Sequence, residues 1–274
     1  MSPSQKRYLK PSVFWSIRQG FPSWLRPVLT LTALAVPLAI WSLLSYGGFI
    51  SETFLPTPTA VLSAGLSMQE KGTLVTDILV SSGRVMVGFG LASLIGIPMG
   101  IAMGTFYSMD SLFGGFVGTV RYMPVAAFTP LMIVWVGIDE LPKVLIVFLG
   151  IVLYNAIMVA DAVKFIPNDT LNVAYTLGAT RRDLLFRVIL PASLPSIVDT
   201  LRVNVAGAWN FLVISELLAA ESGLGYRIVR SQRTLQTDKV LFCILVIGCI
   251  GLLTDLAFRL LARWLLPWAE STQH

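Results

Sequence analysis

The sequence predicts an all-α, polytopic membrane protein with six transmembrane helices. Of its 274 residues, 55% are hydrophobic and only 13% are charged, whereas a soluble domain carries about 25% charged residues. The mean hydropathy is +0.76, and the apolar residues gather in runs of about 20 or more, which is the length that crosses a bilayer. We expect a single transmembrane domain over residues 27–268, preceded by a cytoplasmic N-terminal segment over residues 1–26.

The predicted spans follow one another without a soluble domain between them. The third is interrupted by Pro124 and Pro130, so we expect a kinked or broken helix there. Between the first two spans, residues 56–76 are predicted to form an amphipathic surface helix with Pro58 in its first turn. The approximate spans are residues 27–48, 78–104, 112–137, 142–161, 193–219 and 239–264.

A stripe of small residues runs along the second predicted span. Gly96, Gly100 and Gly104 recur every four residues and follow Ala92. Small residues at this spacing let two helix backbones approach closely in a membrane. The stripe therefore predicts tight packing, either within the subunit or across a dimer.

Basic residues flank the spans and set the expected orientation. The isoelectric point of about 9.4 does not indicate nucleic-acid binding, because no polar domain could present a basic face. Lys and Arg favour the cytoplasmic side, so both termini are predicted to lie inside, although the basic outer segment 227–239 weakens this bias. The inner side then holds Lys6, Arg7, Lys10, Arg18, Arg26, Lys164, Arg181, Arg182, Arg187, Arg259 and Arg263, and the outer side holds Lys71, Lys143, Arg227, Arg230, Arg233 and Lys239.

The sequence offers little that could support catalysis. The one histidine is His274, and no carboxylates are paired at metal-binding spacing, so we expect neither a metal site nor an enzyme active site. Cys243 and Cys249 lie on different faces of one predicted helix and are interpreted as packing residues. Because the sequence lacks a G-x-x-x-x-G-K-[ST] phosphate loop, no cofactor is expected on this chain.

A short polar segment between the fourth and fifth spans has an informative spacing. Residues 172–178 read Asn-Val-Ala-Tyr-Thr-Leu-Gly, and residues 188–191 read Val-Ile-Leu-Pro. This segment resembles the cytoplasmic coupling loop in the membrane subunits of ATP-binding-cassette (ABC) importers, where Glu-Ala-Ala, three residues, Gly, nine residues and Ile-x-Leu-Pro follow one another. Asn172 stands where the Glu is usual, and Val173 replaces the first Ala. The residues in register are Ala174, Gly178, Val188, Leu190 and Pro191.

The predicted coupling loop over residues 162–192 has a pattern suited to binding a partner. We expect a short surface helix over residues 169–186, with apolar residues on one face that fit a groove, small residues that allow close approach, and a basic rim. An ordinary amphipathic loop at the membrane surface is the alternative. The resemblance implies coupling to an ATPase subunit through Leu171, Asn172, Ala174, Tyr175, Leu177, Gly178, Ala179, Arg181, Arg182, Leu190 and Pro191.

The resemblance extends over roughly residues 50–268 and points to the nitrate/sulfonate/taurine/bicarbonate group of ABC permeases. Residues 121–128, Arg-Tyr-Met-Pro-Val-Ala-Ala-Phe, depart from the Pro-Pro-Leu-Ala-Trp type of sequence found in many relatives. The segment after Gly225 resembles the taurine and sulfonate members more than the nitrate and bicarbonate members. The matching segments are Phe54-Leu55-Pro56-Thr57-Pro58, Arg84 with Gly88 and Gly96, Trp135-x-Gly137, Glu216 to Ala220, Gly223 to Tyr226, and Pro267-Trp268.

This resemblance implies a type I ABC importer permease fold and a role in carrying a small anion across a bacterial inner membrane. The expected partners are a second copy of the chain, two cytoplasmic ATP-binding subunits that hold ATP and Mg²⁺, and a substrate-binding protein outside. An ion-gradient-driven secondary transporter or channel for a small anion is the alternative. Against it, six spans without an evident inverted repeat make a small carrier, and the coupling-loop segment would have no role.

Polar residues inside the spans are candidates for a translocation path, because charges there are costly. We expect Arg121, Arg202 and Asn210 to line or gate an anion path, since guanidinium groups grip oxyanions. The alternative is that Arg121 or Arg202 pairs with Glu216 or Asp199 to hold the helices together. Phe128, Met132 and Trp135 are predicted to form an apolar gate or to pack. Glu216 is predicted to support the outer gate or the docked binding protein.

Overall fold

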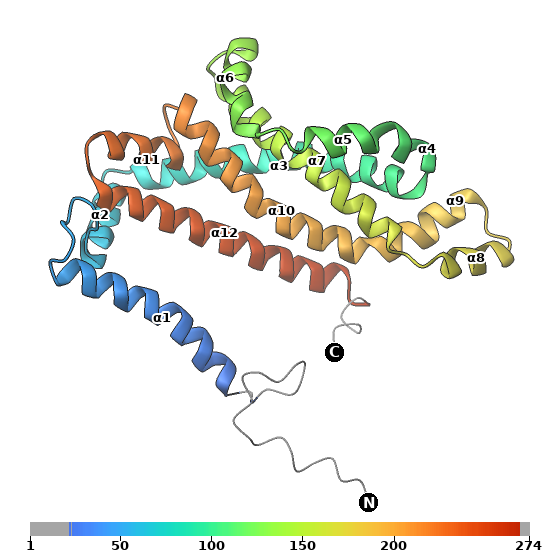
Figure 1. Ribbon diagram of the computed structural model, residues 1–274, viewed down its shortest axis with the longest axis horizontal. Helices are drawn as coiled ribbons and strands as arrows, with labels where there is room; N and C mark the ends of the chain where they lie inside the picture. The colour runs from blue at the N-terminus through green and yellow to red at the C-terminus, as the bar shows by residue number, and fades with distance from the viewer. Residues whose placement is uncertain (1–21, 23, 269–274) are drawn as a thin grey trace, which may run out of the picture. The chain divides into compact units, whose positions relative to one another are not determined.

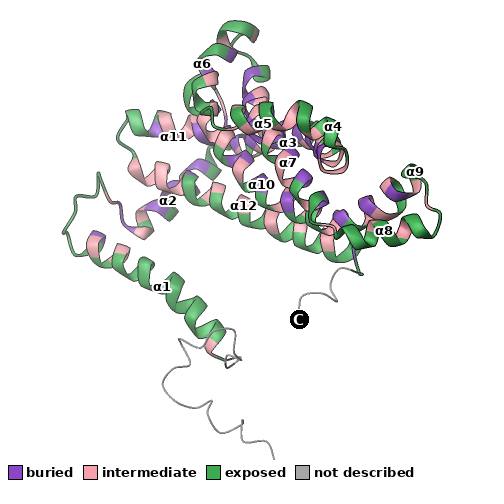
Figure 2. Cartoon of the chain, turned by 45° about the vertical axis from the view of Figure 1, so that its right-hand side comes forward, coloured by how far each residue is buried: buried purple, intermediate pink, exposed green. Residues whose placement is uncertain are grey.

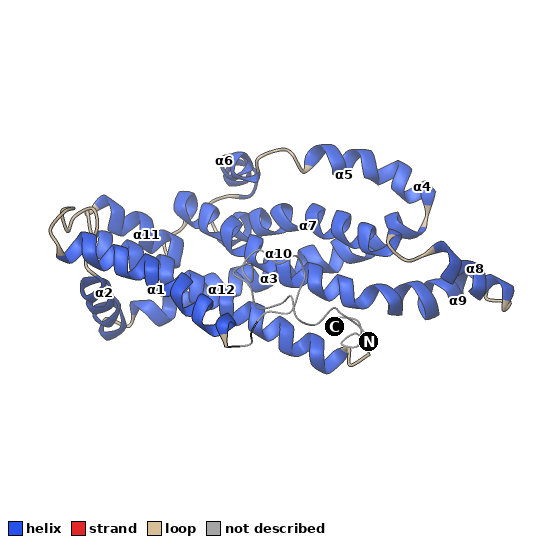
Figure 3. Cartoon of the chain, turned by 60° about the horizontal axis from the view of Figure 1, so that its bottom comes forward, coloured by secondary structure: helices blue, strands red, loops and turns tan. Residues whose placement is uncertain are grey.

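The computed structural model describes residue 22 and residues 24–268, and the regular elements of this part are all helices (Figures 1 and 3). The prediction of an all-α fold is confirmed. The chain divides into two compact units, one up to Ala60 and one from Val61 onward. The predicted N-terminal segment over residues 1–26 lies almost entirely outside the described residues.

The first unit contains the first predicted span. Helix α1 (Leu25–Tyr46) is long and apolar enough to cross a membrane. The chain then folds back on it, because the Trp41 Nε1–H donates to the Pro56 carbonyl at 2.9 Å and the Tyr46 hydroxyl donates to Thr59 Oγ1 at 2.9 Å. These bonds hold the proline-containing segment that leads into α2 (Pro58–Glu70).

Within the described residues, five helical segments meet the length and composition of a membrane span, and one bent pair brings the number to six. The prediction of six spans therefore holds if the bent pair counts as one span. The fifth span is longer than predicted, because helical structure starts at Arg181. Besides α1, the span-forming helices are α3 (Thr73–Thr105), α7 (Glu140–Lys164), α10 (Leu190–Ala219) with the segments before it, and α12 (Thr237–Leu265).

The third predicted span is broken at one of the two prolines expected to interrupt it. The residues from Tyr107 to Val120 and helix α6 (Val125–Val136) meet at 96°. The break falls at residues 121–124, where the Pro124 ring disfavours helical conformation in the preceding residue. Pro130 lies inside α6 without ending it, so the break in the span occurs at Pro124 and not at Pro130. The first arm comprises α4 (Tyr107–Met109), a π-helical segment η2 (Asp110–Gly114) and α5 (Gly115–Val120).

The surface helix predicted over residues 56–76 is shorter than expected. Helix α2 begins at Pro58, as predicted, but ends at Glu70, and α3 already begins at Thr73. Gly72 separates the two helices because it takes a φ of +67°, a left-handed conformation that interrupts a right-handed helix.

The stripe of small residues packs α3 against α7. A Cβ atom built on Gly96 would lie 2.8 Å from the Val152 carbonyl oxygen, and one on Gly100 would lie 2.7 Å from Val159 Cβ. Only a glycine permits this approach of the two backbones. The predicted tight packing is confirmed, and it occurs within the subunit.

The interior of the bundle lies where α3, α7 and α10 meet (Figure 2). A short polar chain crosses this region: the Asn204 amide donates to Asn155 Oδ1 at 2.7 Å, and the Asn155 amide donates to Ser93 Oγ at 3.2 Å. Helix α11 (Leu224–Arg233) and α12 pack beside α10. The outer face of α12 leaves Leu252, Leu253 and Trp264 exposed, as expected for a surface in contact with lipid or another subunit.

Candidate functional site

The predicted coupling loop is built from two helices rather than the single helix expected over residues 169–186. Helix α8 (Asn168–Thr176) is followed by Leu177 as its C-cap and then by Gly178, whose φ is +83°. The Gly178 N–H donates to the Tyr175 carbonyl at 2.9 Å, and the Ala179 N–H donates to the Ala174 carbonyl at 3.0 Å. These two bonds define a Schellman motif, which requires a left-handed residue at its corner. The main role of Gly178 in the subunit is therefore to end α8.

A second helix starts immediately after this turn. The Thr180 hydroxyl accepts the Asp183 N–H at 3.3 Å, and Asp183 Oδ2 accepts the Thr180 N–H at 3.1 Å. This reciprocal arrangement is a capping box, and it begins α9 (Arg181–Asp183). The Thr-Arg-Arg-Asp sequence carries the S/T-x-x-D/E signal for this cap, which the sequence interpretation missed.

The new helix runs into α10 through a wider, π-helical segment η3 (Leu184–Ile189). The Leu190 N–H donates to the Leu185 carbonyl five residues earlier. Pro191 follows, and a proline lacks an N–H and clashes with the carbonyl four residues before it in an α-helix. A local widening relieves that clash. Leu190 and Pro191 therefore lie within a continuous helical segment that begins at Arg181, and not in a loop before a fifth span over residues 193–219, as the sequence predicted.

Helices α8 and α9, with the capped turn between them, form a unit that we call the helical hairpin (residues 168–183). It projects from one end of the bundle (Figure 3). It contacts the rest of the bundle through η3. Tyr175 and Leu177 are exposed, with Leu177 83% accessible. Leu171, Ala174 and Ala179 are half-buried, whereas Asn172, Gly178, Arg181 and Arg182 are exposed. The hairpin thus offers apolar side chains on a short, doubly capped support.

At the opposite end of α3 and α10, Glu216 is the centre of a buried polar network. Its side chain accepts hydrogen bonds from Arg84 Nη1 at 2.7 Å, the Ser81 hydroxyl at 2.8 Å and the Gly225 N–H at 2.8 Å. Arg84 also holds Glu140 through two bonds of 2.6 Å. The network joins α3, α7, α10 and the first turn of α11. Glu216 therefore pairs with Arg84 rather than with Arg121 or Arg202.

The same network closes the loop between α10 and α11. Asp77 accepts the Gly223 N–H at 3.0 Å and forms an ion pair with Arg227 at 2.7 Å. A Cβ atom on Gly223 would clash with the Glu216 carboxylate, and one on Gly225 would lie 2.7 Å from Glu216 Cβ. The two glycines therefore let the loop cover the carboxylate, which explains the Gly-x-Gly spacing that the sequence shows.

The residues predicted to form a gate do not share one environment. Arg121 lies at the bend between α5 and α6, where its Nη2 donates to the Tyr122 hydroxyl at 3.1 Å. On α6, Phe128 is half-buried, Met132 is buried and Trp135 is 63% exposed. Met132 therefore packs inside the subunit, whereas Trp135 is accessible to lipid or to another chain.

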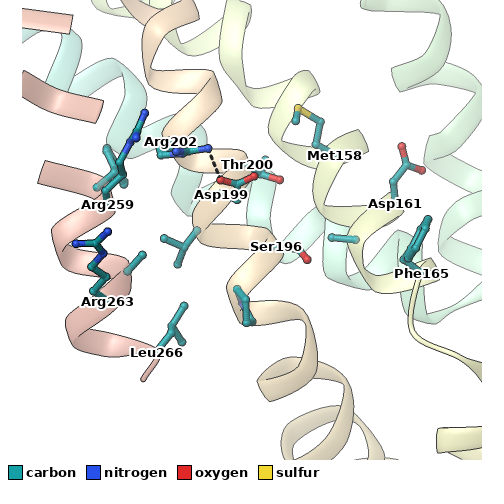
Figure 4. Close-up of a pocket in the computed structure, with 15 residues that line it drawn as sticks. Met158, Asp161, Phe165, Ser196, Asp199, Thr200, Arg202, Arg259, Arg263 and Leu266 are labelled. Carbon is teal, nitrogen blue, oxygen red and sulfur yellow. Dashed lines mark ion pairs between the residues drawn. The ribbon is translucent and has the colours of Figure 1, made fainter. Parts of the chain in front are cut away.

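Arg202 lines a cavity of about 680 Å³ between α7, α10 and α12 (Figure 4). It forms an ion pair with Asp199 at 2.7 Å, as one of the two sequence interpretations proposed, and it also lies 3.7 Å from Asp255. Arg259 and Arg263 of α12 lie on one side of this cavity, and Asp161 of α7 lies on the other. Asn210 is exposed elsewhere on α10. The predicted path residues are thus distributed along the subunit.

The fold defines a class, a multi-pass helical membrane protein with a hairpin exposed at one end of its bundle. Residues 92–267 match the family described as the inner membrane component of binding-protein-dependent transport systems, and the chain belongs to this family. It is the membrane-spanning permease subunit of an ABC importer and is not itself an enzyme. An ion-gradient-driven carrier is thereby excluded.

Named relatives agree with this assignment. The taurine transport permease TauC of Escherichia coli strain K12 is 36% identical over 250 residues, covering 89% of this chain and 91% of the relative. SsuC of Bacillus subtilis strain 168, named for aliphatic sulfonate transport, is 33% identical and covers 86% of each chain. The inward-facing methionine ABC transporter MetNI has a chain with the same fold, at a TM-score of 0.58 and 19% identity, covering 68% of this chain and 95% of that one.

Proposed function

We propose that this permease carries a small oxyanion, with organic sulfonates such as taurine as the favoured class. The main support for this substrate class is that two relatives of similar length are named for taurine and aliphatic sulfonate transport. The cationic Arg202 on α10 suits an anion, because a guanidinium group stays charged and can hold two oxygens at once. Nitrate and bicarbonate remain the other substrates that the sequence resemblance implies.

The proposed orientation has both termini and the helical hairpin in the cytoplasm. Lys164, Arg181, Arg182 and Arg187 gather at the end of the bundle that carries the hairpin, which favours that side by the positive-inside rule. The Arg84–Glu216 network then faces the outside, where a substrate-binding protein delivers its ligand.

The helical hairpin is proposed to dock into a cytoplasmic ATP-binding subunit, which holds the ATP and Mg²⁺ that this chain does not bind. Tyr175 and Leu177 are apolar and exposed, and such side chains on a short helix fit a hydrophobic groove on a partner. The two caps fix the position of α8, so that movement of the ATP-binding subunit reaches α10 through η3. Two copies of the chain and two ATP-binding subunits complete the proposed transporter.

The coupling proposal is tested by Tyr175→Asp, with Val173→Asp as a matched control. The two side chains are similarly exposed on α8, at 55% and 58%, but Val173 lies off the face shared by Leu171, Ala174 and Tyr175. Co-purification of the ATP-binding subunit from native membranes should be lost for Tyr175→Asp and kept for Val173→Asp. Full retention by both variants would contradict the proposed docking face.

The substrate proposal is tested in proteoliposomes that contain the permease, its ATP-binding subunit and its binding protein. ATP-dependent, vanadate-sensitive accumulation of radiolabelled taurine is expected, with bicarbonate and nitrate as competitors. Absence of taurine accumulation, together with ATP-dependent accumulation of labelled bicarbonate or nitrate by the same complex, would rule out the sulfonate class. If the complex hydrolyses ATP but takes up none of these anions, the binding protein delivers a different substrate and the proposed substrate class is wrong.

A further inference from the structure

A second, smaller cavity lies at the end of the bundle that carries the Arg84–Glu216 network. It has a volume of about 400 Å³ and is enclosed by the end of α2, the start of α3, α11 and the start of α12. We call it the basic pocket. Four cationic side chains line it, and none of its described lining residues is acidic: the cations are Lys71, Arg227, Arg230 and Lys239.

The cations of the basic pocket are only partly neutralised. Arg227 forms an ion pair with Asp77 at 2.7 Å. Arg230 Nη1 lies 3.5 Å from the Tyr226 hydroxyl, and Lys239 Nζ donates to Gln236 Oε1 at 2.7 Å, both of which are neutral groups. Among the ion pairs found in the described part of the chain, Arg227 alone of the four has a carboxylate partner. The pocket therefore holds an excess of positive charge within a small volume.

The position of this charge is unusual for a membrane protein. Arg227, Arg230 and Lys239 belong to the basic segment that opposes the predicted orientation, because Lys and Arg normally gather on the cytoplasmic side. Charge on a solvated helix face would need no further explanation. Lys71, Arg230 and Arg233 are all exposed, but Arg233 at the end of α11 does not line the pocket and is of that kind. The other cations, in contrast, are collected around one cavity from three parts of the chain.

We propose that the basic pocket binds an oxyanion, either a phosphate or a sulfonate group. Charge-assisted hydrogen bonds from guanidinium and ammonium groups to such oxygens are short and strong, and a cavity of this size is in the range that holds small ligands. In the proposed orientation the pocket faces the outer side of the membrane, where two sources present this chemistry: the headgroup phosphate of an anionic lipid, and the transported anion itself. The pocket is separate from the cavity around Arg202, and its existence does not rest on the proposed substrate.

The test uses the full complex in nanodiscs made of neutral phosphatidylcholine, so that no anionic lipid competes. Binding of radiolabelled sulfate is measured by equilibrium dialysis for the natural protein, for the triple variant Lys71→Gln/Arg230→Gln/Lys239→Gln, and for Arg233→Gln. Removing three of the four cations is expected to weaken sulfate binding about tenfold or more, whereas removing the matched cation outside the pocket leaves it unchanged. Arg227 is kept, because it also holds Asp77 in the buried network.

Two further arms identify the source of the oxyanion. If a lipid phosphate fills the pocket, sulfate binding falls in nanodiscs that contain phosphatidylglycerol, and native mass spectrometry finds more retained phosphatidylglycerol on the natural protein than on the triple variant. If the transported anion fills it, taurine displaces sulfate equally well in both kinds of nanodisc. Either result supports the site.

Three outcomes would overturn the proposal. One is the absence of saturable sulfate binding by the natural protein. Another is an equal loss of binding in Arg233→Gln and the triple variant, since that would indicate diffuse surface charge. The third is unchanged sulfate binding in the triple variant together with weaker association of the binding protein, which would assign the basic residues to protein docking.

Discussion

Arg84 and Glu216 form a buried ion pair of 2.7 Å between α3 and α10, with side chains that are 3% and 0% exposed. The carboxylate is further held by Ser81 and the Gly225 N–H, and the guanidinium by Glu140. A charge removed from water needs this degree of compensation, because an unpaired ion in a low-dielectric interior is very costly. The pair fastens the α10–α11 loop to α3, so it is expected to act as a structural clamp.

The clamp predicts a marked asymmetry between the two carboxylates that bind Arg84. Replacing Arg84 with Met leaves Glu216 buried without its cation and should destabilise the protein by roughly 3–5 kcal/mol. Replacing Glu140 with Gln keeps the Arg84–Glu216 pair and removes a partner that is 64% exposed. Glu140 also binds the buried Lys143 Nζ at 3.1 Å, so the cost should exceed the roughly 0–1 kcal/mol of an exposed pair and stay below that of Arg84→Met. Thermal unfolding of the detergent-solubilised protein measures the difference. Equal losses in the two variants would show that burial of Glu216 does not control the stability of this end.

The conformation of Gly178 predicts which residues can replace it. Its φ of +83° disfavours Ala or Val by roughly 1–2 kcal/mol, whereas Asn tolerates left-handed conformations. A Cβ atom at this position would meet nothing within 4 Å in the subunit. Co-purification of the ATP-binding subunit should therefore fall in the order Gly, Asn, Ala, Val. If Asn is instead worse than Ala, the glycine is needed for close approach to the partner, as the sequence alone had suggested.

The glycine stripe of α3 predicts that the cost of a methyl group depends on the helix face. Gly96→Ala would place Cβ 2.8 Å from the Val152 carbonyl, and overpacking of this kind costs about 1–3 kcal/mol. Gly90→Ala is the matched control, because its Cβ would meet nothing within 4 Å, and it should leave stability unchanged or raise it by up to about 1 kcal/mol. Yield and the thermal midpoint of purified protein report both effects, and equal behaviour of the two variants would contradict the close packing.

Much of the fold could be predicted from the sequence, because the bilayer imposes a length and a composition on each span. The glycine spacing of α3 identified a packing face, and the i, i+3 relation of Asp199 and Arg202 made their ion pair foreseeable. The partners of Glu216 could not be predicted in this way. Arg84 lies 132 positions away along the chain, and a single sequence does not indicate which helices become neighbours.

The helical hairpin illustrates a different limit. Its boundaries were contained in the sequence, as Gly178 followed by the Thr180 and Asp183 capping pair, but the apolar spacing of Leu171, Ala174 and Tyr175 favoured one continuous helix. The local capping bonds divide the segment into two helices, because a glycine in the left-handed conformation cannot continue a helix, whatever the pattern of apolar residues on either side.

The ion pairs of Arg202 predict different mutant phenotypes for a residue that lines the translocation path and for one that only holds helices together. Arg202→Lys keeps a positive charge near Asp199 and Asp255, while Arg202→Gln removes it. If Arg202 attracts the transported anion, uptake should fall about tenfold or more in Arg202→Gln and recover in part in Arg202→Lys, because charge rather than the planar fork supplies the long-range attraction. Thermal stability should change little in both, since the Arg202 ion pairs are partly exposed.

The control for Arg202 is Arg259→Gln, which removes a cation that lines the same cavity and pairs with Asp255 at 2.7 Å. Arg259 comes from α12 rather than α10, so it changes the charge of the cavity while leaving the Arg202–Asp199 pair intact. Normal uptake with lowered stability in Arg202→Gln would assign the residue to holding α10 and α12 together. Loss of uptake in both variants would instead assign the attraction to the net charge of the whole cavity.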